Sequence, residues 1–253
     1  MSAVTPSLDE RLRALKDRGP AVPGPLPPLV RVSGAARSYG EGSAARVALR
    51  QTNCEISDGD RIALMGPSGS GKSTLLHLMA GLDQPTVGTV DWPGIGPREA
   101  LRPGPVAIVF QGPSLLPALS VVENVALPLI FGGQSNDEAT ARADRALAQL
   151  ELSELRDKLP EEISGGQAQR VAVGRALAGE PRLILADEPT GQLDREIGSH
   201  VVDLLIAAAD HADAALVIST HDPAIGARLP TRWQLADGEL LVSADDDSKE
   251  TPR

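Results

Sequence analysis

The sequence predicts an α/β fold with a mostly parallel sheet, because apolar segments of strand length alternate with segments of helical periodicity. The expected strands are residues 61–65, 106–110, 183–186 and 215–218. Between the second and third of them the pattern becomes helical, over residues 120–131 and again over 136–152. We therefore expect a helical lobe, over about residues 112–163, inserted between two halves of the α/β core.

A glycine-rich loop follows the first expected strand and fits the spacing G-x-x-x-x-G-K-[ST]. Its glycines let successive backbone N–H groups turn toward an anion without obstruction by side chains. A helix is expected over residues 72–81, and its N-terminus adds a favourable dipole for phosphate. An ordinary Gly/Ser turn would not require this order of strand, loop and helix. The predicted nucleotide-binding residues are Gly66, Pro67, Ser68, Gly69, Ser70, Gly71, Lys72, Ser73 and Thr74.

The residue types in and near this loop suit phosphate and magnesium chemistry. Lys72 is expected to bridge the β and γ phosphates, and the Ser73 hydroxyl is expected to bind Mg²⁺, a hard cation that prefers oxygen ligands. Asp187, at the end of the strand 183–186, is the expected second metal ligand, directly or through water. Side chains alternate along a strand, so Glu188 points differently, and we assign it to polarising the attacking water. The alternative for this acidic pair is a solvated strand end.

A Ser-Gly-Gly-Gln segment begins the helix that is expected over residues 165–177. Ser164 and Gln167 have the spacing of a capping box. A cap does not require Gly165 and Gly166, each of which lowers helix propensity by about 1 kcal/mol relative to alanine. Their presence indicates that another backbone or a ligand approaches closely. The γ phosphate is the natural candidate, since a helix N-terminus attracts anions.

Together, the glycine loop, the Ser-Gly-Gly-Gln segment and the Asp-Glu pair resemble the ATPase of ATP-binding cassette (ABC) proteins, over a predicted domain at residues 29–243. The resemblance implies a P-loop NTPase core with an antiparallel β subdomain and an inserted α-helical subdomain, and it implies ATP and Mg²⁺ as cofactors. It also implies roles for residues that alone would suggest only packing or surface positions. These are Tyr39 stacking on adenine, Gln111 touching Mg²⁺ or the attacking water, Asp194 in a loop that meets the opposite subunit, and His221 sensing the γ phosphate.

The family resemblance also implies that the active unit is a dimer. In ABC proteins the Ser-Gly-Gly-Gln helix completes the site of a second copy, so Lys72 of one chain would lie opposite Ser164 and Gly166 of the other. Each chain carries one of each element, and a two-fold homodimer would therefore contain two equivalent ATP sites.

Several segments are most similar to the ATP-binding subunits of lipoprotein-release, macrolide-export and cell-division complexes. This similarity implies an ATP-hydrolysing subunit that powers a membrane transporter or a force-transmitting complex through ATP-driven dimerisation. We expect residues 121–129 to contact an integral membrane permease subunit, with packing in the core as the open alternative. The second functional hypothesis is a soluble, non-transport ABC ATPase or a nucleotide-gated regulatory scaffold.

Composition excludes several other classes. A chain of 253 residues with 42% hydrophobic content can bury a substantial core as one domain. The net charge of -10 argues against a nucleic-acid partner, whose phosphates require clustered lysine and arginine. Cys54 is the single cysteine, which excludes an internal disulfide and agrees with a reducing compartment. No apolar run approaches the roughly 20 residues that span a bilayer, so we expect another, separately encoded chain to cross the membrane.

The two ends of the chain differ from the predicted domain. Residues 1–28 are expected to form a flexible extension, with a short amphipathic segment followed by a proline-rich linker, and residues 244–253 an acidic disordered tail. Asp9 and Glu10 fall where a signal peptide would be apolar. We therefore expect a cytoplasmic protein, held on the inner face of the cell membrane by its membrane subunit.

Overall fold

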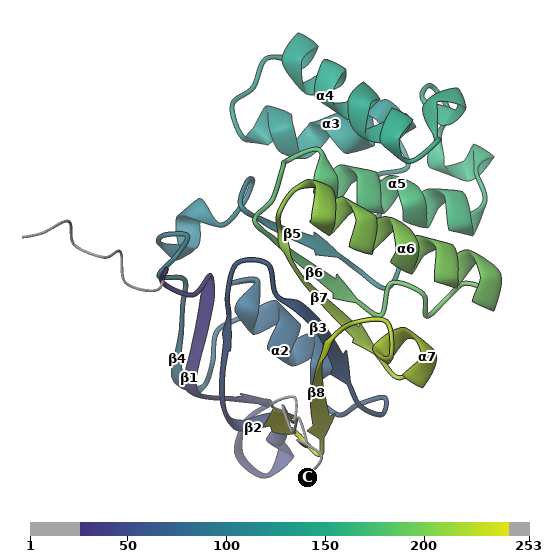
Figure 1. The fold of residues 1–253 in the computed structure, drawn as a ribbon. Helices are drawn as coiled ribbons and strands as arrows, with labels where there is room; N and C mark the ends of the chain where they lie inside the picture. The colour runs from purple at the N-terminus through teal and green to yellow at the C-terminus, as the bar shows by residue number, and fades with distance from the viewer. Residues whose placement is uncertain (1–25, 243–253) are drawn as a thin grey trace, which may run out of the picture.

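The computed structural model describes residues 26–242, so most of the predicted N-terminal extension and the whole acidic tail lie outside the described residues. The described chain contains two sheets and a set of helices (Figure 1). None of the helices in this part of the chain is both long enough and apolar enough to cross a membrane. The boundaries of the extension, the domain and the tail stay predictions.

The larger sheet forms the centre of the fold and has the strand order β5-β6-β7-β3-β8-β9. Its strands are β3 (Arg61–Met65), β5 (Val106–Val109), β6 (Leu183–Asp187), β7 (Ala215–Thr220), β8 (Thr231–Ala236) and β9 (Glu239–Val242). Every neighbouring pair is parallel except β8 and β9. All residues of β6 and β7 are buried, as expected for parallel strands that are covered on both faces. The prediction of a mostly parallel sheet is confirmed, although β8 and β9 have no counterpart among the expected strands.

The smaller sheet is antiparallel, with the strand order β2-β1-β4. Its strands are β1 (Val30–Tyr39), β2 (Arg46–Ile56) and β4 (Val87–Asp91). Helix α2 (Lys72–Met79) contacts strands of both sheets, and its Leu75 and Leu76 share one apolar cluster with Leu49 of β2 and Leu64 of β3. This sheet is the antiparallel β subdomain that the resemblance implied. Cys54 lies buried within β2, and burial raises the pKa of its thiol to about 12.

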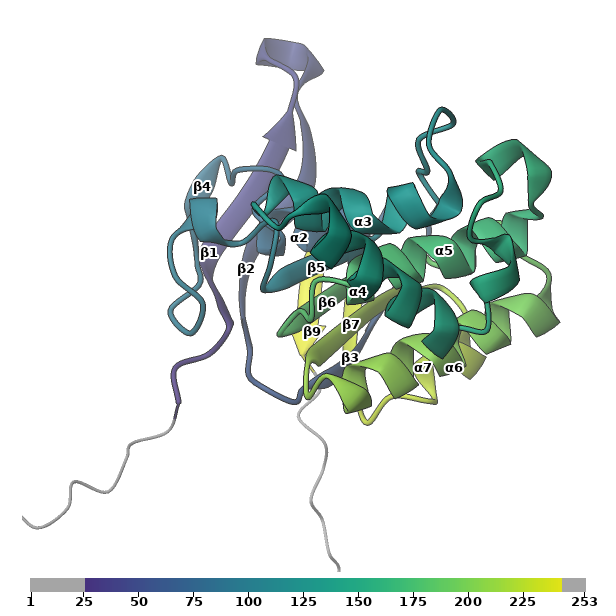
Figure 2. The ribbon, with the colours of Figure 1, turned by 90° about the horizontal axis from the view of Figure 1, so that it is seen from above.

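The remaining helices lie on the other side of the larger sheet (Figures 1 and 2). They are α3 (Val121–Phe131), α4 (Asn136–Gln149), α5 (Gly165–Leu177), α6 (Arg195–His211) and the short α7 (Pro223–Gly226). Helices α5 and α6 pack directly against its strands, whereas α3 and α4 pack mainly against each other and α5. Alternation along β6 separates the two cores, because Ile184 and Ala186 belong to the cluster under these helices whereas Leu183 and Leu185 belong to the cluster around α2. The described part of the chain also contains four short 3₁₀ turns, at Gly42–Ala44, Arg98–Ala100, Ser153–Leu155 and Pro160–Glu162.

Helices α3 and α4 form the inserted lobe, and each begins with a serine capping box. Five apolar side chains of residues 121–129 are buried in the protein's own core; they are Val121, Val122, Val125, Ala126 and Leu129. The packing alternative therefore holds for these five side chains, because α3 packs its apolar stripe against α4 and α5. Leu127 and Pro128 are half-buried, and contact of this segment with a membrane subunit stays a prediction. Glu123 is exposed, as is Phe131 at the end of α3, with 75% of its surface accessible.

Candidate nucleotide-binding and catalytic site

The glycine loop joins β3 to α2 and lies close to the backbone of two strands, β8 of the larger sheet and β2 of the smaller one. A Cβ atom at Gly66 would overlap the carbonyl oxygen of Leu235 in β8, and one at Gly71 would overlap that of Ala48 in β2. Gly69 has a positive φ of 78°, but a Cβ there would meet nothing within 4 Å. Two of the three glycines are thus required by the fold itself, a reason that the motif alone does not reveal.

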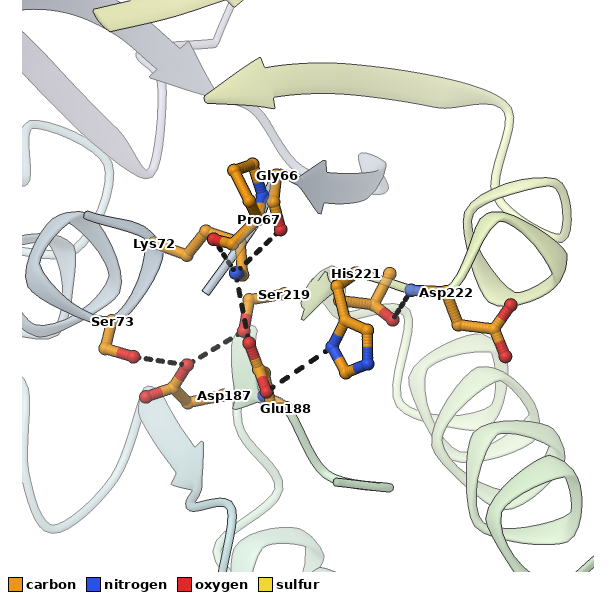
Figure 3. Close-up of polar contacts among 10 residues, drawn as sticks. Gly66, Pro67, Lys72, Ser73, Asp187, Glu188, Ser219, His221 and Asp222 are labelled. Carbon is orange, nitrogen blue, oxygen red and sulfur yellow. Dashed lines mark hydrogen bonds and ion pairs between the residues drawn. The ribbon is translucent and has the colours of Figure 1, made fainter. Parts of the chain in front are cut away.

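Lys72 occupies the centre of this loop, with only 4% of its side chain exposed (Figure 3). Its ammonium group donates hydrogen bonds to the carbonyl oxygens of Gly66 at 2.9 Å and Pro67 at 3.0 Å. It also lies 3.0 Å from Oε1 of Glu188. These three contacts match the three donors of an ammonium group, so the positive charge is held at a defined position inside the loop.

Asp187 and Glu188 lie at the end of β6 and contact different groups (Figure 3). Oδ1 of Asp187 accepts hydrogen bonds from the hydroxyls of Ser73 at 3.0 Å and Ser219 at 2.8 Å. Oε2 of Glu188 lies 3.7 Å from Nδ1 of His221, while its other carboxylate oxygen pairs with Lys72. The structure thus brings four predicted catalytic or metal-binding positions together around Glu188.

The backbone of Glu188 has a φ of 41°, in the left-handed region that non-glycine residues rarely adopt. Such a conformation costs about 1–3 kcal/mol and persists only where neighbours hold it. Here the Glu188 N–H donates to the Ser219 hydroxyl at 2.9 Å, and the Glu188 carbonyl accepts from the N–H of Gly191 at 3.0 Å. These contacts hold the backbone at the position from which the Glu188 carboxylate reaches Lys72 and His221.

Ser219 is a site residue that the sequence analysis did not identify. It is fully buried, and its hydroxyl both donates to Asp187 and accepts from the Glu188 backbone. In the parallel pairing of β6 with β7, Ser219 lies opposite Asp187. A polar residue near the end of the strand before His221 was the available signal, but its partner depends on which strands are neighbours.

Tyr39 lies at the end of β1 with 43% of its surface exposed. Its hydroxyl donates to Oδ2 of Asp83 at 2.8 Å, and the Arg37 guanidinium carbon lies 4.6 Å from the ring centroid. Desolvation raises the pKa of Asp83, but the hydrogen bonds from the Gln84 N–H, Tyr39 and Arg37 outweigh it and hold the pKa below its usual value. The tyrosine ring is therefore oriented by a carboxylate that stays ionised.

The other residues implied by the resemblance lie around this centre. Gln111 follows β5 and lies against the loop after Glu188, where a Cβ at Gly191 would come within 2.8 Å of the Gln111 amide nitrogen. Asp194 is the N-cap of α6 and accepts from the N–H of Ile197 at 2.9 Å. Glu188, Asp194 and His221 line one open groove of about 640 Å³.

The Ser-Gly-Gly-Gln segment forms the start of α5 but does not join this centre. Ser164 and Gln167 form the predicted capping box, with N–H to side-chain hydrogen bonds of 2.9 and 3.2 Å. Among residues 26–242, no hydrogen bond or ion pair connects them to the glycine loop or to Glu188. Gly166 packs against the protein's own Ile197, since a Cβ there would lie 2.7 Å from Cγ2, whereas a Cβ at Gly165 would meet nothing within 4 Å. Of these two glycines, Gly165 is the one that no contact within residues 26–242 explains.

Comparisons with known proteins agree with this geometry. Residues 49–191 match the family model described as ABC transporter. The chain belongs to the ABC transporter family. The lipoprotein-releasing system ATP-binding protein LolD of Legionella pneumophila (strain Paris) is 42% identical over 213 residues, which are 81% of this chain and 94% of that protein. The macrolide export ATP-binding/permease protein MacB of Rhodopseudomonas palustris (strain BisB18) is 41% identical over 83% of this chain, but only 33% of that protein.

A solved structure of an ABC cassette has the same fold. The dimeric structure of a post-hydrolysis state of the ATP-binding cassette MJ0796, bound to ADP and Pi, gives a TM-score of 0.74 at 36% identity and covers 84% of this chain and 98% of that one. The predicted fold and the prediction of an ATP-binding and ATP-hydrolysing ABC subunit are confirmed. The roles of individual site residues stay predictions.

The glycine loop generates a prediction about stability. We expect Gly71→Ala to lower the free energy of unfolding by at least about 2 kcal/mol more than Gly69→Ala, because only the first change forces a side chain into a neighbouring backbone. Both changes place alanine at a positive φ, which costs about 1–2 kcal/mol in each variant. Urea unfolding of the two variants measures the difference, and equal losses would contradict the steric explanation.

Ser219→Ala should weaken both stability and turnover, because Asp187 and the Glu188 N–H each lose a buried hydrogen-bond partner. The expected loss of unfolding free energy is about 1–3 kcal/mol. Urea unfolding and steady-state ATPase assays check it, with Ser33→Ala on the exposed face of β1 as the control. Wild-type stability and turnover in Ser219→Ala would show that the hydroxyl does not organise the carboxylates.

Proposed function

We propose that two copies of this chain close head to tail on two ATP molecules, so that the start of α5 in each copy completes the site around Lys72 of the other. The observation that carries this proposal is the exposed start of α5, which makes no polar contact with the glycine loop of its own chain. A second copy gives this surface a partner and closes the symmetry. The cassette MJ0796, whose structures are described as dimeric, supports an active unit of two copies.

The start of α5 suits an anion chemically. The first N–H groups of a helix have no partner within the helix, and the helix dipole makes this end positive. The Ser164 and Gly165 positions are exposed, so a phosphate can approach them without displacing a side chain of this chain. We propose that Ser164, Gly165, Gly166 and Gln167 contact the γ phosphate of the ATP held by the partner copy. Gly166 would contact the phosphate through its backbone N–H, since Ile197 occupies the space where a Cβ atom would lie.

The donors near Asp187 fit Mg²⁺. The Ser73 hydroxyl and the Asp187 carboxylate lie within 3.0 Å of each other, and both are oxygen donors of the kind that this ion prefers. We propose that Ser73, Asp187 and Gln111 hold the ion, directly or through water. When bound, Mg²⁺ would neutralise charge on the β and γ phosphates.

We propose that Glu188 positions the attacking water and accepts its proton. The water oxygen forms a bond to the γ phosphorus while the bond from that phosphorus to the ADP oxygen breaks. The Lys72 ammonium group lies 3.0 Å from Oε1 of Glu188. A γ phosphate bound beside Lys72 would replace Glu188 as the anion that pairs with the ammonium group. The released Glu188 oxygen could then accept a hydrogen bond from the attacking water. His221, at 3.7 Å from the same carboxylate, would contact the γ phosphate and orient Glu188.

The remaining proposed contacts involve the base and the opposite subunit. Tyr39 would stack on adenine with its exposed ring face, with its hydroxyl fixed by Asp83. Asp194, which lines the groove beside Glu188 and His221, would lie at the interface between the two copies.

We further propose that the dimer works with integral membrane permease subunits on the inner face of the cell membrane. Two relatives support this proposal, since one is named as part of a lipoprotein-releasing system and the other as a macrolide export ATP-binding/permease protein. Copurification with a candidate permease, followed by ATPase assays with a lipoprotein or a macrolide, tests the proposal. Stimulation by permease and substrate would support it, while ATP binding without hydrolysis in the presence of the permease would favour a regulatory scaffold.

Glu188→Gln should lower ATP turnover by about 10²-fold or more, because the amide cannot accept the water proton. ATP binding should persist, and a closed dimer should accumulate and be visible as a doubled mass by size-exclusion chromatography with light scattering. Glu180→Gln is the control, because Glu180 pairs with Arg142 at 3.0 Å in the helical part of the protein. Wild-type turnover of Glu188→Gln would refute the assigned role.

Ser164→Arg should abolish the ATP-dependent dimer without changing ATP binding by the monomer, since the larger side chain blocks the surface that meets the partner. Ser135→Arg is a closely matched control, because Ser135 is also an exposed N-cap with a capping box, on α4. Both changes lose a cap worth about 1 kcal/mol. Dimer mass in the Glu188→Gln background and fluorescent-nucleotide titration measure the two effects. Equal behaviour of the two variants would rule out a contact in trans at Ser164.

A further inference from the structure

The segment that carries Gln111 is held mainly by side chains from the helical part of the protein. We call residues 110–120 the Gln111 loop; it contains no helix or strand. Among the described residues, its backbone forms hydrogen bonds with four side chains from outside the loop, Gln169 and Arg175 of α5 and Asn124 and Glu123 of α3, the last through the capping box at Ser120. The position of the loop therefore depends on these two helices.

The two side chains from α5 donate hydrogen bonds to the first half of the loop. The amide of Gln169, which is only 1% exposed, donates to the carbonyl oxygen of Phe110 at 3.0 Å. Arg175 donates from Nη1 to the carbonyl oxygen of Ser114 at 2.8 Å and from Nη2 to that of Pro113 at 3.0 Å. Gln111 thus lies between backbone carbonyls that are both tied to the same helix.

Arg175 makes these contacts without a carboxylate partner among the described residues, and burial lowers the pKa of its guanidinium group. Withdrawing a guanidinium group from water is unfavourable unless other groups replace its hydration. Here the two loop carbonyls do so, and the planar donor pair of arginine suits two adjacent acceptors. This geometry fits a residue whose role is to hold the loop against α5.

Asn124 holds the second half of the loop. Its side chain accepts from the Leu116 N–H at 2.7 Å and donates to the carbonyl oxygens of Leu116, Leu119 and Ser120 at 2.9 to 3.1 Å. It is only 1% exposed, so its polar atoms depend on these contacts. The far end of the loop is thus fixed to α3, which itself packs against α5.

We propose that Gln169 and Arg175 are positioning residues that join the Gln111 loop and α5 into one rigid unit. A displacement of the loop then displaces the start of α5, with Ser164 and Gly165, relative to the partner copy. This inference rests on the proposed dimer. Through the contacts of Gln169 and Arg175, the Gln111 loop beside one ATP site would set the position of the start of α5, which completes the other ATP site.

The test compares Arg175→Met and Gln169→Leu, alone and combined, with Arg142→Met in the full chain. Arg142 is a suitable control because it is also a half-buried helical arginine that donates to a backbone carbonyl, that of Ala178 at 3.1 Å, away from the Gln111 loop. Arg175→Lys keeps the charge but not the paired donors, and it serves as the conservative variant if Arg175→Met does not fold. Each change is also made in the Glu188→Gln background to measure closure.

We expect hydrogen exchange of the 111–120 amides to rise at least about tenfold in Arg175→Met and in Gln169→Leu, and not in Arg142→Met. The ATP concentration that half-closes the dimer should rise about tenfold, while ATP affinity of the monomer stays within about twofold of wild type. Arg175→Lys should lie between wild type and Arg175→Met in both measurements. A purely structural role would instead lower thermal stability and monomer ATP affinity together.

Unchanged exchange in the loop, or closure at the wild-type ATP concentration, would overturn the inference. So would a parallel loss of monomer ATP affinity and closure in the folded variants. Failure of the Glu188→Gln protein itself to dimerise would instead refute the proposed dimer, so the two failures are distinguishable.

Discussion

The site depends on one constraint, the side-by-side parallel pairing of β3, β7 and β6, whose carboxyl ends meet at one edge of the sheet. This pairing puts Ser219 opposite Asp187 and brings the glycine loop, which leaves β3, to the same edge. Lys72, Ser73 and Glu188 can then meet although more than a hundred residues separate the loop from the acidic pair. Ligand sites of open α/β sheets usually form at this edge, because loops rather than strands fill the space beyond it.

Local patterns predicted the elements that depend on local physics. The glycine spacing, the serine cap of α5 and the apolar strands all follow from backbone conformation and periodicity over a few residues, and each lies within a few residues of its expected position. The unbroken apolar run of β6 is typical of a strand that is buried on both faces of a sheet. The charged residues, hydroxyl residues and glycines of the predicted site could be identified because each belongs to a short motif whose spacing is visible in the sequence.

Long-range packing is what the sequence could not predict. The apolar face of residues 121–129 suits a membrane partner as well as it suits α4 and α5, and only the fold shows that the core uses it. The sequence suggests that Gly166 leaves room for a ligand, whereas in the structure the side chain of Ile197 packs against it. Ser219 and Arg175 belong to no motif that names a function, and both matter through partners distant in sequence. In each case the missing information was which elements are neighbours.

The buried thiol of Cys54 has a practical consequence for measuring motion between the copies. It is the single cysteine of the chain, it lies inside β2, and a pKa of about 12 keeps it protonated and unreactive near neutral pH. The natural protein can therefore serve directly as the background for site-directed spin or fluorescent labels. A cysteine introduced on the exposed surface of α4 or β1 would be the only thiol to react, and distances between labelled copies could be followed through a nucleotide cycle without removing a native residue.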